Sequence, residues 1–180
     1  MPNTSLSNVI SFNGGDGVFV SGGTGNTILT NQEFDNGGLG IDLAGGTEDP
    51  FGVTANDVDP SGSTDDADTG PNDLQNYPII TDAYQDDLST VASVVWVTPY
   101  STPNQTFTTQ IFARNLGSED GEGDALLEQV TVSTDANGQA TFSTLVDAVA
   151  GTPLTATATN TATGDSSEFS ETVYVYEHRF

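Results

Sequence analysis

From residue 79 onward, apolar and polar residues alternate in short runs separated by glycine, proline, asparagine and aspartate. A period of two residues is typical of β-strands that bury one face. Seven runs predict strands at residues 79–84, 90–98, 106–114, 126–133, 140–145, 154–160 and 171–176. Seven short strands at this spacing are typical of an immunoglobulin-like antiparallel β-sandwich. The side chains expected in its core are Trp96, Phe107, Ile111, Val130, Val132, Phe142 and Val173.

One connection in this region carries a specific turn signal. The stretch TVSTDANGQATF, residues 131–142, places Asn137 and Gly138 between two of the predicted strands. Both residue types tolerate the positive φ that a tight two-residue turn requires. We therefore expect a β-hairpin at this position.

Two stretches near the N-terminus repeat each other. NVISFNGGDGVFV (8–20) and NTILTNQEFDNGGLGIDL (26–43) both begin Asn-x-Ile and both reach Gly-Gly-x-Gly before alternating apolar residues. Their starts, Asn8 and Asn26, indicate a period of about 18–20 residues, which is typical of a solenoid built from short β runs and Gly/Asn corners. The alternative interpretation is two unrelated hairpins. The residues expected to point inward are Ile10, Val18, Val20, Ile28, Phe34, Ile41 and Leu43.

The order of these segments resembles a known arrangement. FDNGGLGIDL followed by DADTGPNDLQNYPII, and then STPNQTFTTQIFA, VTVSTDANGQATFSTL and LTATATNTATGDSSEFS, resemble the C-terminal region of large bacterial surface and secreted proteins. The resemblance implies an all-β fold, in which short right-handed parallel β-helix coils precede an immunoglobulin-like antiparallel β-sandwich. It implies β-helix coils over 1–47, an acidic connecting loop over 48–78 and the sandwich over 79–180. It also implies an extracellular or cell-surface location.

The charge balance restricts the partners of the protein. The 180 residues include 26 acidic residues and only two basic ones, Arg114 and Arg179, for a formal net charge of −24. Such a chain is repelled by phosphate backbones and anionic membrane surfaces, so we expect no nucleic-acid partner. No apolar run approaches the length of a membrane span, and we expect no direct membrane insertion. The absence of cysteine excludes disulfides and thiolate metal sites.

The stretch ANDVDPSGSTDDADTGPNDLQNYP, residues 55–78, concentrates carboxylates between glycines and prolines. Part of it resembles the Asp-x-Asp-x-Gly start of many calcium loops, and Ca²⁺ prefers six to eight oxygen ligands. It is not an EF-hand, because Tyr77 occupies the position of the final glutamate. The alternative is a solvated acidic linker, as most acidic runs are. The candidate Ca²⁺ ligands are Asp57, Asp59, Asp66, Asp68, Asn72 and Asp73.

The sequence argues against an enzyme. Polysaccharide lyases need a basic residue to abstract a proton, but the chain has no lysine and neither arginine lies in the coils. A glycosidase needs only two spaced carboxylates, and Asp16, Glu33, Asp35 and Asp42 are available. Two coils are nevertheless too small for a substrate groove. The only histidine, His178, is the third residue from the end of the given sequence.

We therefore expect a non-catalytic, extracellular structural or adhesive protein. Two coils leave an open face with unpaired backbone groups, which must be covered by more coils, a cap or another subunit. Such a face predicts self-association, including head-to-tail assembly into filaments, or contact with neighbouring domains of the same surface protein. The alternative is a cation-dependent carbohydrate- or surface-binding module of a larger secreted protein or polysaccharide-degrading enzyme. Against this alternative, the sequence has no clustered exposed aromatic platform for sugars, and only Tyr77, Tyr84 and Tyr100 are plausible contacts.

Overall fold

The computed structural model of the chain describes residues 7–57, 66, 69–86, 93–115 and 121–178. Within these residues the regular structure is almost entirely β-strand, which confirms the predicted all-β class. The one helical segment that they contain is a short 3-10 turn, Pro71–Leu74. No helix in this part of the chain has the length and hydrophobicity that crossing a membrane requires.

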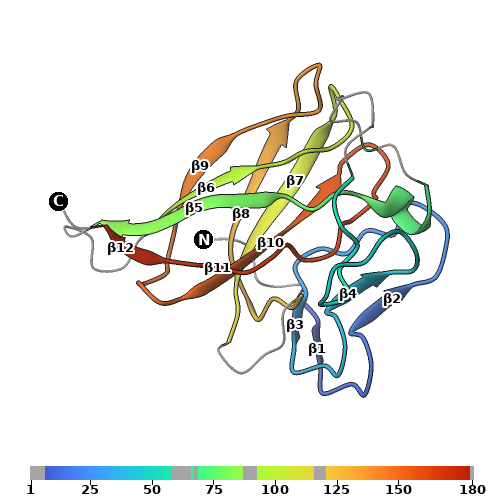
Figure 1. Cartoon of the computed structure of the whole chain (residues 1–180), viewed down its shortest axis with the longest axis horizontal. Coiled ribbons are helices and arrows are strands. Elements are labelled where there is room, and N and C mark those ends of the chain that lie inside the picture. The colour runs from blue at the N-terminus through green and yellow to red at the C-terminus, as the bar shows by residue number, and fades with distance from the viewer. Residues whose placement is uncertain (1–6, 58–65, 67–68, 87–92, 116–120, 179–180) are drawn as a thin grey trace.

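Two four-stranded sheets make up most of the fold (Figure 1). The first has the strand order β11-β10-β7-β8 and the second has the order β12-β5-β6-β9. Neighbouring strands are antiparallel except β12, which runs parallel to β5. Each of the seven predicted strands overlaps an observed one, and the last is divided at Val175 between the two sheets. The bounds are β5 Ile79–Asp86, β6 Ser93–Thr98, β7 Thr106–Ala113, β8 Ala125–Ser133, β9 Phe142–Val146, β10 Pro153–Asn160, β11 Val173–Tyr174 and β12 Tyr176–His178.

The two sheets enclose a shared hydrophobic core. Val95 and Val97 of β6 are fully buried, and so are Ile111 of β7 and Leu154 of β10. Trp96, which we predicted to be in the core, is 41 % exposed instead. Successive side chains of a strand point to opposite faces, so burying the two flanking valines turns Trp96 outward.

The predicted hairpin at residues 131–142 is wrong. Gly138 does adopt a positive φ of 73°, as a tight turn requires. However, β8 pairs with β7 whereas β9 pairs with β6, so the turn connects two different sheets. A turn signal identifies a reversal of the chain and does not identify the strands that pair beyond it.

The N-terminal region consists of four short strands, β1 Val9–Ser11, β2 Val18–Val20, β3 Gln32–Phe34 and β4 Ile41–Leu43. They form two parallel pairs, β1 with β3 and β2 with β4, seen at the lower right of Figure 1. Asn8 bonds to Asn31 and Asn13 to Asn36, each 23 residues apart. The predicted spacing of 18 residues, from Asn8 to Asn26, is therefore wrong. We call residues 8–20 the first repeat and residues 31–43 the second repeat.

A second hydrophobic cluster joins the repeats to the first sheet. Ile41 and Leu43 of the second repeat, each 1 % exposed, belong to one cluster with Phe112 and Phe169. The two phenylalanine rings meet edge to face, with centroids 5.3 Å apart. Edge-to-face contact is a favourable arrangement of aromatic rings. The second repeat therefore packs directly against the sheets.

Candidate functional site

One side of the second repeat lies against the first repeat. The opposite side, called its outer side, is covered by the segment that precedes β8. Backbone bonds join Glu33 and Gly123 in both directions, each at 2.9 Å, and Gly40 donates its N–H to the Gly121 carbonyl at 2.8 Å. The Glu122 carboxylate accepts the N–H of Asp35 at 3.0 Å, the N–H of Asn36 at 2.8 Å and the Asn36 side-chain amide at 3.0 Å. These contacts satisfy backbone donors that would otherwise be left unpaired at the end of the strand pair.

Glu168, 2 % exposed, covers the rest of this side. Its carboxylate accepts the backbone N–H of Leu43 and that of Thr54, both at 2.6 Å. Burial raises the pKa of Glu168 to about 7, although the hydrogen bonds to Leu43 and Thr54 act in the opposite direction. Sequence reasoning missed Glu122 and Glu168 as capping groups, because acidic side chains are rarely buried and no local pattern marks these two.

Glu33 is a third buried acid, 1 % exposed, and its Oε2 has no hydrogen-bond partner. Its pKa is raised to about 8, mainly by burial; a hydrogen bond with the Asn31 side chain acts in the opposite direction, and the negative charge of Glu122 adds to the increase. A carboxyl in this environment holds its proton at pH values where exposed glutamates are ionised. The junction of repeat and sheet thus contains groups that titrate near neutral pH.

The side of the first repeat that faces away from the second repeat, called the open side, is not covered by any of the described residues. Gly37 and Ala44 of the second repeat donate backbone N–H groups to the first repeat, at Asn13 and Val20. The equivalent donors of the first repeat are the N–H groups of Gly14 and Ser21, which have no partner in the described part of the chain.

Three large apolar side chains of the first repeat are exposed. They are Val9 at 60 %, Phe12 at 76 % and Phe19 at 58 %. The equivalent positions of the second repeat hold polar residues, Gln32, Asp35 and Asp42. The first repeat thus exposes large apolar side chains at positions where the second repeat has polar ones.

The glycines of the two repeats have different surroundings. A Cβ on Gly37 would lie 2.9 Å from the Gly14 carbonyl oxygen, and a Cβ on Gly38 would collide with Asp16. The second repeat therefore needs glycine where the first repeat approaches it. Gly14 and Gly15 are the equivalent residues, yet a Cβ on either would meet nothing within 4 Å. Neither has a positive φ, so their backbone conformation does not require glycine.

The predicted Ca²⁺ ligands do not all lie together. Asn72 is fully buried, and its side-chain amide bonds to Asn26 and to the Ser166 carbonyl. Asp66 Oδ2 accepts hydrogen bonds from Gln75 and Ser101.

Two of the remaining predicted ligands, Asp57 and Asp73, lie near Asp66. Asp73 and Asp66 line one polar pocket, and Asp66 and Asp57 both hydrogen-bond to Asn76. Asp57 Oδ1 is buried and has no hydrogen-bond partner among the described residues. Asp59 and Asp68 lie outside the described residues. No group of three or more acidic or histidine side chains suited to a metal occurs in the described ranges.

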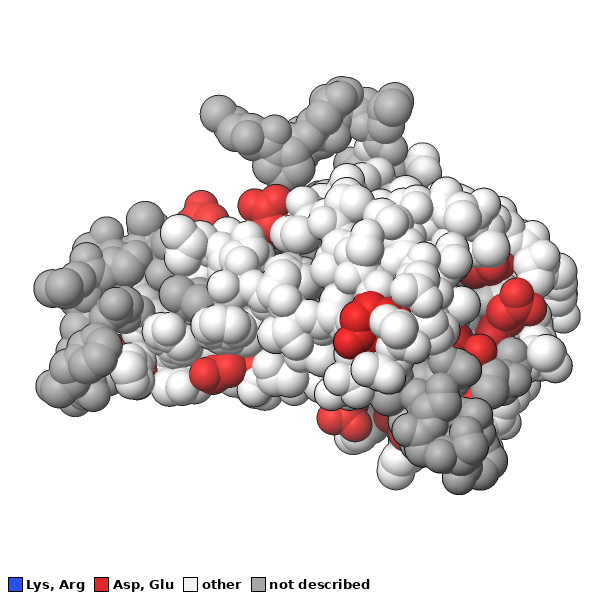
Figure 2. Space-filling model, turned by 90° about the horizontal axis from the view of Figure 1, so that it is seen from above, with Lys and Arg blue, Asp and Glu red and all other residues white. Residues whose placement is uncertain are grey.

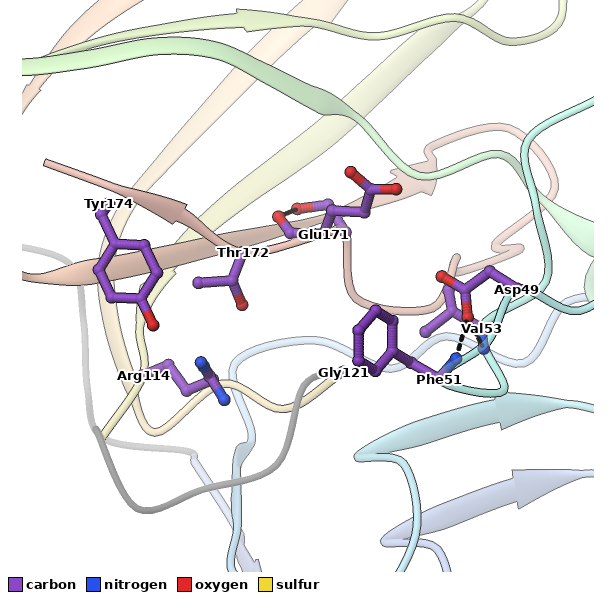
Figure 3. Close-up of a pocket in the computed structure, with 9 residues that line it drawn as sticks. Asp49, Phe51, Val53, Arg114, Gly121, Glu171, Thr172 and Tyr174 are labelled. Atoms are coloured by element: carbon purple, nitrogen blue, oxygen red, sulfur yellow. Dashed lines mark hydrogen bonds between the residues drawn. The ribbon is translucent and has the colours of Figure 1, made fainter.

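A pocket of about 320 Å³ lies between the segment that follows the second repeat and the edge of the first sheet (Figure 3). Two exposed aromatic residues, Phe51 and Tyr174, line it together with Asp49, Arg114 and Glu171. None of the tyrosines predicted for sugar contact lines this pocket. Those predicted residues lie elsewhere: Tyr77 is buried, Tyr84 packs against Tyr176 and His178, and Tyr100 is half-buried.

Acidic side chains are scattered over the surface and form no single patch on the face shown in Figure 2, where no lysine or arginine is visible among the coloured residues. No protein-family model matches this chain, and no curated protein matches its sequence. The function is therefore inferred from the geometry of the two ends of the repeat pair and of the pocket.

Proposed function

We propose that this protein is a non-catalytic, extracellular structural or adhesive module. In this proposal the two repeats are the last coils of a right-handed parallel β-helix, and the two sheets form an immunoglobulin-like sandwich that closes its end. The strand order supports the second part. The first, second and fifth of the seven strands share one sheet and the third, sixth and seventh share the other, as in immunoglobulin domains, although β8 lies beside β7.

The observation that carries the proposal is the pair Gly14 and Gly15. Glycine in a strand-rich repeat loses more conformational entropy on folding than other residues, so it persists where a side chain cannot fit or where φ must be positive. Within the described part of the chain, neither reason applies to these two residues. Gly37 and Gly38 are glycine because a neighbouring repeat lies against them. A further coil on the open side of the first repeat accounts for Gly14 and Gly15 in the same way.

The partner of the open side is therefore another β-coil of the same pattern. It comes from a second copy of the chain, which is the self-association expected from the sequence, or from a neighbouring part of the same surface protein. The N–H groups of Gly14 and Ser21, which have no partner among the described residues, supply hydrogen bonds, and Phe12 and Phe19 supply apolar area. Because the sandwich covers the other end of the pair, a head-to-tail filament requires the open side to meet a different kind of surface on the next copy.

Gly14→Val tests this role, since the valine projects from the open side without touching any described residue. Ala136→Val, at an exposed position in the turn between β8 and β9, is the control. Sedimentation velocity and electron microscopy detect stacking between copies. A chain in which residues 8–30 are duplicated ahead of Asn8 detects stacking of a neighbouring coil, through slower hydrogen exchange at Gly14 and Ser21.

We expect Gly14→Val to abolish the association that is observed, whether between copies or with the duplicated segment. Without the duplicated segment, the variant should have the same melting temperature as the unmodified chain. The control should associate normally. If neither copies nor the duplicated segment cover the open side, or if Gly14→Val associates as the parent does, the proposal is wrong.

A calcium ion at the acidic loop is a second candidate role, favoured by the buried, unpartnered Oδ1 of Asp57. Asp57 and Asp66 would hold the ion. Asn72 does not fit as a ligand, because its amide is engaged with Asn26 and Ser166. The bound ion would neutralise the carboxylates of Asp57 and Asp66.

A further inference from the structure

The pocket lined by Phe51 and Tyr174 has the features of a ligand site that the coil-stacking proposal does not use. We propose that it binds an uncharged saccharide, either a free sugar or the end of a glycan chain. The inference rests on the adhesive half of the proposed function and is independent of whether another coil stacks on the first repeat. Three features of the pocket support it: walls held in place by hydrogen bonds, charged groups of both signs, and two exposed aromatic rings.

Both walls of the pocket are held by short-range contacts. On one wall, Asp49 Oδ1 accepts the backbone N–H groups of Phe51 at 2.8 Å and Val53 at 3.0 Å, which fixes the turn that carries the Phe51 ring. Behind this turn, the Glu168 carboxylate holds Thr54. A ring on a fixed turn loses little conformational entropy when a ligand binds.

The other wall is organised around Pro153 of β10. Tyr174 of β11 is the register partner of Pro153, and Arg114 donates its backbone N–H to the Pro153 carbonyl at 2.9 Å. Residues that face one another across neighbouring strands project from the same side of a sheet. The phenol of Tyr174 and the guanidinium of Arg114 therefore rise from one side of the first sheet, and Figure 3 shows both directed into the space that Phe51 borders.

The charges that line the pocket are of both signs. Arg114, the only lysine or arginine among the described residues, reduces the attraction of the pocket's two carboxylates for a cation. Asp49 and Glu171, together with a formal net charge of −24, oppose an anion. A ligand that carries no charge and both donates and accepts hydrogen bonds can interact with groups of either sign. Arginine only donates, carboxylates only accept, and a sugar hydroxyl does both.

The two aromatic rings complete the match to a sugar. Phe51 is 63 % exposed and Tyr174 is 52 % exposed, so both retain a large uncovered apolar face. The face of an aromatic ring carries partial negative charge and attracts the weakly positive C–H groups of a pyranose ring. The pocket volume of about 320 Å³ lies at the lower end of the range for small-molecule sites, ~300–1,000 Å³, and so suits a short ligand.

Saturation-transfer NMR tests the proposal with the whole chain, because the method detects the weak binding typical of single sugars. The probes are neutral mono- and oligosaccharides of glucose, xylose, mannose, galactose and N-acetylglucosamine. Polygalacturonate and a lysine-rich peptide provide the anionic and cationic alternatives. We expect saturation transfer to at least one neutral sugar, and titration should show about tenfold weaker binding for Phe51→Ala and for Tyr174→Ala.

Two further variants identify the site. Tyr174→Phe keeps the ring and should retain most of the affinity, whereas Trp96→Ala removes an exposed ring on the other sheet and should change nothing. Melting temperatures verify that each variant is folded. Absence of transfer to every neutral sugar overturns the proposal, as does binding that survives both alanine substitutions. Preferred binding of the anionic or the cationic probe through this pocket also overturns it. Failure of coil stacking in the Gly14→Val experiment leaves these outcomes unaffected.

Discussion

Asn13 of the first repeat makes two hydrogen bonds to one oxygen of Asn36 in the second: its backbone N–H and its side-chain amide both donate to Asn36 Oδ1, at 3.2 and 2.9 Å. Asn36 then donates its own amide to the Ile10 carbonyl at 3.1 Å and to Glu122 at 3.0 Å. One buried side chain thus joins the first repeat, the second repeat and the segment before β8. The two repeats and the segment before β8 therefore share a single hydrogen-bond network at Asn36.

Replacing Asn36 with alanine should destabilise the fold strongly. The substitution removes four side-chain hydrogen bonds: two part-buried bonds from Asn13, one to the Ile10 carbonyl and one to the buried Glu122, which keeps its backbone donors. Each such bond contributes about 0.5–1.5 kcal/mol. We expect a loss of roughly 2–4 kcal/mol in the free energy of unfolding, measured by urea denaturation. Asn8→Ala, which removes one exposed amide bond to Asn31, is the control and should cost less than about 1 kcal/mol. Equal losses for the two variants would contradict a central role for Asn36.

Glu168→Ala should loosen the attachment of the second repeat to the sheets. It removes the acceptor for the backbone N–H groups of Leu43 and Thr54, both of which are shielded from water. We expect a cost of about 2–5 kcal/mol and faster hydrogen exchange at those two amides. Glu48→Ala, at an exposed acidic residue of the same region, should leave both measurements near those of the parent. Unchanged exchange at Leu43 would contradict the capping role.

The buried acids predict that stability decreases as pH rises through neutrality. The pKa is raised to about 8 for Glu33 and to about 7 for Glu168, whereas unfolded glutamates titrate near 4.5. The folded state therefore holds protons that the unfolded state has released. The stabilisation is complete below about pH 4.5 and is lost as pH rises through 7 to 8. Urea denaturation between pH 5 and pH 8.5 should show this decline.

Glu33→Gln separates this effect from the general repulsion of a chain with a net charge of −24. Acid relieves the general repulsion in both proteins, but only the parent has the Glu33 carboxyl to deprotonate. The variant should therefore lose less stability than the parent over the same pH range. Parallel curves for the two proteins would show that Glu33 makes no contribution.

Gly123→Ala should disturb the second hydrophobic cluster. The added Cβ would lie 2.5 Å from the Phe169 ring and 3.0 Å from Phe112, and both rings are buried. Overpacking of this kind costs about 1–3 kcal/mol. Thermal unfolding should show a lower melting temperature than for Gly22→Ala, whose Cβ meets nothing. A melting temperature equal to that of the control would mean that the cluster adapts without cost.

Calcium should stabilise the protein if the acidic loop holds an ion. At a concentration 100 times the dissociation constant, a ligand specific for the folded state adds about 2.7 kcal/mol. We expect a higher melting temperature in millimolar Ca²⁺ than in EDTA, and we expect Asp57→Asn to reduce that difference. Asp147→Asn, at an exposed site in the β9–β10 connection, is the control. Melting that does not respond to calcium would remove this role.

The strands of the two sheets could be predicted because their signal is local. Alternation around Val95 and Val97 marks β6 whatever it packs against. The same pattern led to the wrong prediction that Trp96 is in the core, since alternation divides a strand into two faces without saying which is buried. The tail shows a similar limit. Alternation places Tyr174 and Tyr176 on one face of a single strand, but the chain changes sheets at Val175 and separates them.

The spacing of the repeats was present in the sequence, but two signals competed. Asn13-Gly14-Gly15 and Asn36-Gly37-Gly38 are 23 residues apart and give the observed register. The match between Asn8 and Asn26 was misleading, because Asn26 instead contacts Asn72. Glycine pairs that lie against each other across repeats are the more reliable signal, since the close approach itself selects glycine.

The all-β class, the seven strands and the existence of an N-terminal repeat could be predicted from the sequence, because alternation and turn residues are patterns of a few neighbouring positions. The fold was needed to show which strands pair, which end of the repeats is covered, and that Glu33, Glu122 and Glu168 are buried there. These features depend on segments about 85 to 125 residues apart meeting in space, as in the contacts of Asn36 with Glu122 and Leu43 with Glu168. A burial that depends on such distant partners leaves no periodic pattern in the sequence.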